Sequence, residues 1–156
     1  MNLNLCSLMS YQSDLLKAFN AQLISHSALL LASLTSTFIF LSKFRPHHLA
    51  GTIMYHLTGG ALFGVTFYVV YRLILYGQLW MATIHCSDKG YENFHEYYLE
   101  VYKNAFEYMK HSRWAWPSPW IIASFRRFHS FPIITRAICC LLLGCLITWL
   151  IYYSLL

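Results

Sequence analysis

Residues 52–70 read TIMYHLTGGALFGVTFYVV and contain no Asp, Glu, Lys or Arg over nineteen positions. An α-helix rises 1.5 Å per residue, so about twenty apolar residues cross the roughly 30 Å hydrocarbon core of a bilayer. The stretch is therefore long enough to span a membrane as a helix. Its three glycines and its histidine, His56, are not needed for that purpose and require a separate explanation.

Two other stretches have the same apolar character. Residues 23–42 read LISHSALLLASLTSTFIFLS, and residues 137–156 read AICCLLLGCLITWLIYYSLL. The central run ends at Arg72 but continues with apolar residues to position 84. The sequence thus predicts an all-α integral membrane protein with transmembrane helices over 23–42, 52–72 and 137–156, and it leaves open an extension of the second helix to 84. All 156 residues are assigned to a single membrane domain.

The composition of the chain agrees with this fold class. Charged residues make up 11% of the sequence, against about a quarter in a soluble domain. The net charge is +5, and the basic residues flank the apolar runs. This arrangement favours anionic lipid headgroups, rather than nucleic acid, as the partner of the positive charge. The five cysteines form no CxxC pair, which excludes a disulfide framework and a zinc ribbon.

The glycines of the opening stretch predict a close helix contact. Gly60 and Gly64 form a GxxxG step, which lets two helix backbones approach each other. In the first span, Ala28, Ala32 and Ser36 recur at every fourth residue and form a matching stripe of small side chains. Because the loop between the two spans is short, we expect them to be antiparallel neighbours with the stripe facing the glycines. The same face is also suited to a partner subunit.

Residues 90–113 predict an amphipathic helix on the inner side of the membrane. On a helical wheel the charged residues fall within roughly 100° of arc, opposite a face rich in tyrosine and phenylalanine. The pair Glu92 and His95 has the spacing of a di-iron ligand motif, but it occurs once. Glu92 belongs to the charged face of the wheel whereas His95 falls on the apolar side, so a solvated helix face is the favoured interpretation. Residues 1–22 predict a further amphipathic segment at the N-terminus.

Residues 114–136 combine aromatic and basic side chains around Pro117 and Pro119, which interrupt a helix. Tryptophan and arginine beside a membrane span are typical of an anchor at the lipid–water boundary. The residues assigned to this lipid interface are Arg72, Trp114, Trp116, Trp120, Arg126, Arg127 and Arg136.

The distribution of Lys and Arg predicts the orientation of the chain. The loop 43–51 contains two such residues, Lys43 and Arg45, whereas the opposite side contains nine. By the positive-inside rule, the N-terminus and residues 73–136 are expected on the cytoplasmic side and the C-terminus on the outer side.

Histidines are the candidate ligands for copper, zinc or haem. His47, His48 and His56 lie near one outer loop and are candidate copper or zinc ligands, although no acid or cysteine joins them. His26 lies near the inner end of the first span and His56 near the outer end of the second, so they are at opposite faces of the membrane and cannot share a haem iron. An approach of His85 to His26 depends on the unknown direction of residues 73–84. No cofactor is therefore predicted, with copper, zinc or haem kept as alternatives.

The sequence contains no catalytic motif, which favours a non-enzymatic role. Our leading hypothesis is an accessory, structural subunit of a larger integral membrane complex, in contact with other membrane subunits or with copies of itself and with anionic lipids. One alternative is a homo-oligomeric channel or pore-forming effector. Its polar lining would come from Ser33, Thr35, Ser36, Thr37, Thr58 and Thr66. A second alternative is a metal- or haem-binding redox subunit.

Overall fold

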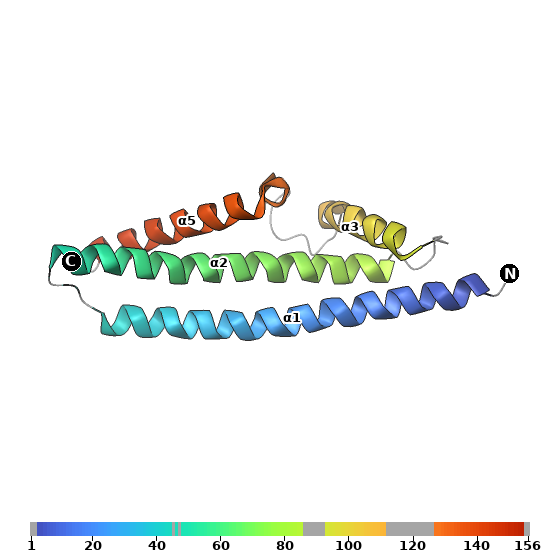
Figure 1. The fold of residues 1–156 in the computed structure, drawn as a ribbon, viewed down its shortest axis with the longest axis horizontal. Helices are drawn as coiled ribbons and strands as arrows, with labels where there is room; N and C mark the ends of the chain where they lie inside the picture. Colours follow the sequence, from blue (N-terminus) through green and yellow to red (C-terminus); the bar gives the residue numbers. More distant parts are fainter. Residues whose placement is uncertain (1–2, 45, 47, 86–92, 112–126, 155–156) are drawn as a thin grey trace. The chain divides into compact units, whose positions relative to one another are not determined.

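The computed structural model describes residues 3–44, 46, 48–85, 93–111 and 127–154, and these residues form helices without any strand. The main helices are α1 (Leu3–Lys43), α2 (Leu49–His85), α3 (Phe94–His111) and α5 (Ile133–Ser154), drawn in Figure 1. Three segments are long and apolar enough to cross a membrane, namely Tyr11–Lys43, Leu49–His85 and Ile133–Ser154. The predicted all-α membrane fold with three spans is confirmed.

The helices are longer than the spans predicted from hydropathy. The second helix continues past Arg72 to His85, because no proline interrupts it and its only later glycine, Gly77, is tolerated inside the helix. The third begins at Ile133 instead of residue 137. Pro132 immediately precedes it and accepts a hydrogen bond from the backbone N–H of Arg136 at 3.0 Å. The predicted interfacial segment is therefore corrected at its end, since residues 133–136 belong to α5.

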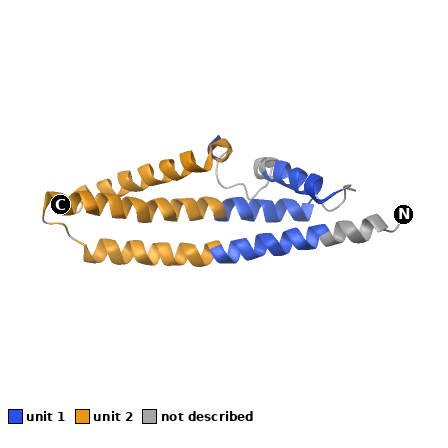
Figure 2. Ribbon diagram, viewed as in Figure 1, with its two compact units in different colours: residues 1–25, 73–128 blue, residues 26–72, 129–156 orange. Residues whose placement is uncertain are grey.

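The chain divides into two compact units, coloured separately in Figure 2. Unit 1 comprises residues 1–25 and 73–128, and unit 2 comprises residues 26–72 and 129–156. All six acidic residues of the sequence fall within unit 1. Unit 2 contains four basic residues and no acidic one, and it includes all of the predicted spans 52–72 and 137–156 and residues 26–42 of the first.

Unit 2 is built on contacts of α2 with both other spans. The ring of Phe40 on α1 stacks on Tyr55 of α2, with 5.1 Å between the ring centroids. Tyr55 also approaches Tyr152 near the end of α5, whereas Gly64 lies beside Cys140 near its beginning. These two contacts show that α2 and α5 run antiparallel.

Unit 1 has a core of its own, in which α3 packs on the last turns of α2. Val101 and Ala105 are fully buried, and the Tyr97 hydroxyl donates a hydrogen bond to the Thr83 carbonyl oxygen at 3.3 Å. Asn93 caps α3, since its Oδ1 accepts the N–H of Glu96 at 2.9 Å. Further buried apolar side chains among the described residues of this unit are Leu15, Phe19, Leu75, Leu79 and Ala82.

Two details of α3 differ from the helical-wheel prediction. The buried face is centred on Tyr97, Val101 and Ala105, and Phe94 at its edge is exposed. His95, which the wheel placed on the apolar side, is exposed as well. The wheel fixes the angles between residues but not the side on which α2 packs, which explains the difference.

Candidate functional site at the contact of α2 and α5

A close helix contact in unit 2 is made by glycines on both partners. A Cβ atom placed on Gly64 would lie 3.1 Å from the carbonyl oxygen of Cys140 and 3.1 Å from the Cα of Leu141. A Cβ atom on Gly144 would lie 2.7 Å from the backbone nitrogen of Gly64 and would also meet the carbonyl oxygen of Gly60. The backbones of α2 and α5 therefore touch directly, which only glycine permits at these positions.

The helix that faces the GxxxG step is α5, so the expected contact between these glycines and the small-residue stripe of the first span is wrong, although α1 does pack on α2 through Phe40 and Tyr55. Ala28, Ala32 and Ser36 are exposed, and α1 instead buries Ser33 and Thr37. On a helix these two sets are centred about 120° apart. The small-residue stripe of α1 is consequently not covered by the described residues of this chain.

The third span contains a stripe of small residues that the sequence analysis did not identify as the partner of the α2 glycines. Cys140, Gly144 and Thr148 recur at every fourth position and are all buried. The Thr148 hydroxyl donates to the carbonyl oxygen of Gly144 at 2.9 Å and lies 2.8 Å from a Cβ atom placed on Gly59. The stripe that matches the α2 glycines is therefore on α5.

The hydroxyl groups proposed to line a pore are bonded within their own helices or exposed. The Thr37 hydroxyl donates to Ser33 at 2.8 Å, and the Thr66 hydroxyl donates to Leu62 at 2.9 Å. Ser33, Thr37 and Thr66 are buried at helix contacts. The other three members of the set, Thr35, Ser36 and Thr58, are exposed.

A polar cluster lies where α5 begins, and it consists of Tyr71, His129 and Arg136. An Nη atom of Arg136 donates to the Tyr71 hydroxyl at 2.8 Å, and the guanidinium carbon lies 5.8 Å from the centre of the tyrosine ring. The Tyr71 hydroxyl also hydrogen-bonds to Nδ1 of His129. The imidazole tautomer decides which of the two groups donates in this second hydrogen bond.

Burial and the neighbouring positive charges both favour the neutral form of His129. Burial of the imidazole, together with the positive charges of Arg136 and Arg72, lowers the pKa of His129 below its ordinary value of 6.5. In the neutral tautomer with its proton on Nε2, the imidazole accepts a hydrogen bond from the Tyr71 hydroxyl at Nδ1. Since neither His129 nor Tyr71 carries negative charge, the cluster leaves the Arg136 cation without a counter-ion.

Arg136 differs from the anchor residue expected from the sequence. It is 9% exposed, and its Nε atom is buried without a hydrogen-bond partner among the described residues. Arg72 is half-buried and Arg127 is exposed. The remaining predicted interface residues, Trp114, Trp116, Trp120 and Arg126, lie outside the described residues.

An apolar groove of about 430 Å³ runs beside the glycine contact and the polar cluster. Ile133 and Ala137, which flank Arg136 in sequence, line it, and so does Tyr68, whose ring lies 6.0 Å from that of Tyr71. The other lining residues are Ala61, Gly64, Val65, Cys140 and Leu141.

The histidines predicted as metal ligands are placed only in part. His48 is exposed, and His47 lies outside the described residues. Nδ1 of His56 lies 2.7 Å from the Thr52 carbonyl oxygen, and its Nε2 is buried without a hydrogen-bond partner in the part of the chain that is described. Within that part, no three His, Cys, Asp or Glu side chains gather in a metal-binding arrangement. The copper, zinc and haem alternatives stay predictions.

Comparison of the chain with protein-family models, with curated proteins and with solved structures gave no match.

Proposed function

We propose that this chain is a non-catalytic, accessory subunit of a larger integral membrane assembly, acting through helix packing and lipid contact. The observation that carries the proposal is the small share of each span that the chain itself buries. In the most apolar windows, 11% of residues are buried in the first span, 33% in the second and 22% in the third. Such a chain offers most of its membrane surface to other molecules.

The uncovered small-residue stripe of α1 is the surface on which we expect a partner helix. In a membrane, lipid tails are as apolar as leucine, so helices associate where small side chains allow close backbone contact. Ala28, Ala32 and Ser36 offer such a face and are exposed. A lipid-facing surface has no need of small side chains, whereas a helix contact does.

Replacement of Ala32 by leucine is expected to release the partner, because the added side chain separates the two backbones. The chain would be extracted in mild detergent and the mass of the assembly measured by native mass spectrometry. Ser27→Leu is the matched control, since Ser27 is exposed on the other side of α1, away from both the stripe and the buried Ser33. We expect the control to keep the assembly intact.

The outcome of that measurement separates the proposed roles. Foreign subunits in the parent assembly, lost with Ala32→Leu alone, support the accessory role. A ring containing only this chain would favour a homo-oligomeric channel instead. A monomer in the parent preparation would contradict both.

The proposed subunit has residues 73–136 on the cytoplasmic side. Support comes from the nine Lys and Arg residues on that side of the spans, against two in the 43–51 loop. Cysteines introduced at Leu49 and Leu99, both exposed, test this orientation. A membrane-impermeant maleimide is expected to label Leu49→Cys in intact cells but Leu99→Cys only after permeabilisation, with the parent chain giving the background. The reverse pattern would invert the topology.

A further inference from the structure

We infer that the groove between α2 and α5 holds an anionic phospholipid, with its phosphate against Arg136 and one acyl chain along the groove. This inference rests on the lipid contact of the proposed function and gives it a specific site. It is carried by a buried cation without a counter-ion, by the groove that adjoins it, and by the absence of acidic residues from the sequence of unit 2.

The buried positive charge of Arg136 requires an anion that the residues of unit 2 do not supply. A charged group within a membrane span is costly unless it is paired. Arg136 lies in the first turn of α5 and is 9% exposed, yet no carboxylate of the described residues pairs with it. The sequence of unit 2 holds four basic residues and no acidic one. His129 is neutral and adds no negative charge.

The hydrogen-bonding capacity of Arg136 is also unfilled. A guanidinium has five N–H donors in a planar fork that matches the oxygens of a phosphate. In the described structure the hydrogen bond of Arg136 goes to Tyr71, through an Nη atom, and its buried Nε donor has no partner. The Tyr71 contact holds the guanidinium in place and leaves donors for a second acceptor. A phosphate accepts two such bonds at once.

The groove supplies the apolar half of the site. Its volume of about 430 Å³ falls within the range of sites for small molecules, roughly 300–1,000 Å³. Two of its lining residues lie close to Arg136 in sequence, since Ile133 is three residues before it and Ala137 directly follows it, so the groove adjoins the helix turn that carries the cation. Gly64 and Ala61 leave room in the groove because neither has a large side chain. Because the groove lies between two membrane spans, an acyl chain reaches it directly from the bilayer.

Native mass spectrometry of the delipidated protein in detergent tests the inference. Dioleoyl phosphatidylglycerol and dioleoyl phosphatidylcholine are added separately, since they share acyl chains and differ in net charge. We expect at least about tenfold tighter binding of phosphatidylglycerol. Arg136→Gln is expected to abolish this preference. Ala61→Phe, which fills the groove and leaves the cation in place, is expected to weaken the binding of both lipids.

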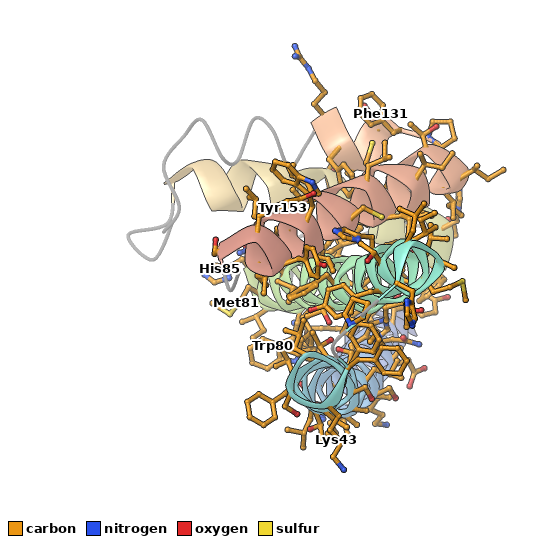
Figure 3. All side chains as sticks on the ribbon, turned by 90° about the vertical axis from the view of Figure 1, so that its left-hand side faces the viewer. Lys43, Trp80, Met81, His85, Phe131 and Tyr153 are labelled. Atoms are coloured by element: carbon orange, nitrogen blue, oxygen red, sulfur yellow. The ribbon has the colours of Figure 1, made fainter. Side chains whose placement is uncertain are left out.

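Two control variants match these changes. Lys43→Gln removes a positive charge at the last turn of α1, where the side chain projects away from the helices (Figure 3), and should leave the preference intact. Ala50→Phe adds the same bulk as Ala61→Phe at an exposed position outside the groove. Equal binding of the two lipids to the parent protein, or an unchanged preference in Arg136→Gln, would overturn the inference.

The same spectra keep this inference separate from the accessory role. Loss of lipid preference in Arg136→Gln with the partner subunits still bound supports the lipid site. Loss of the partners with lipid preference unchanged overturns it and assigns Arg136 to a protein contact. Absence of partner subunits in every preparation, together with an Arg136-dependent lipid preference, supports the lipid site and contradicts the accessory role.

Discussion

Replacing Gly144 by alanine is expected to detach α5 from α2. The added methyl group would meet the carbonyl oxygen of Gly60 and would lie 2.7 Å from the backbone nitrogen of Gly64. Backbone atoms on a straight helix cannot move aside as a flexible side chain does, so the whole helix must shift. Overpacking of this kind typically costs about 1–3 kcal/mol, and we expect the upper end of that range. Unfolding in mixed detergent micelles, followed by tryptophan fluorescence, measures the loss.

The matched control is Gly77→Ala on α2, the helix against which Gly144 of α5 packs. No atom lies within 4 Å of a Cβ built at this position among the described residues. Alanine is the better helix former, so the change should be neutral or stabilise the protein by about 0.5–1 kcal/mol. If both glycine variants lost the same stability, the loss at Gly144 would have to come from something other than the backbone contact.

Replacing Leu79 by alanine is expected to loosen α3 from the end of α2. Leu79 is 2% exposed in the core of unit 1, where Val101 and Ala105 of α3 are also buried. Truncating a buried leucine to alanine costs about 2–5 kcal/mol, since burial is lost and a cavity remains. Hydrogen exchange of the α3 amides should accelerate accordingly, while α5 in unit 2 keeps its protection.

Leu99→Ala provides the comparison for this prediction, because it removes the same atoms from a side chain that is 51% exposed. We expect an effect below about 1 kcal/mol. Equal acceleration of α3 exchange in the two variants would show that α3 is not held by the core around Leu79.

Fold class and span positions were predictable because they depend on local properties. A run of about twenty apolar residues is long enough to cross a bilayer wherever it stands in the chain. Residues 52–70 contain such a run, and the structure places them inside one helix. Gly60 and Gly64 were also recognisable as a contact face, since a GxxxG step depends on spacing along a single helix. The polar residues of the first span, in contrast, gave no indication of which side would be buried.

Only the tertiary structure shows which helix of the chain packs against each helix face. Both the Ala28–Ala32–Ser36 stripe and the Cys140–Gly144–Thr148 stripe have the spacing that suits the α2 glycines, and the structure selects the second. Likewise, Arg136 resembles an ordinary interfacial arginine in the sequence, and only its contact with Tyr71, sixty-five positions away, shows that it is buried. Helical periodicity fixes which residues share a face, whereas packing between helices distant in sequence determines what that face meets.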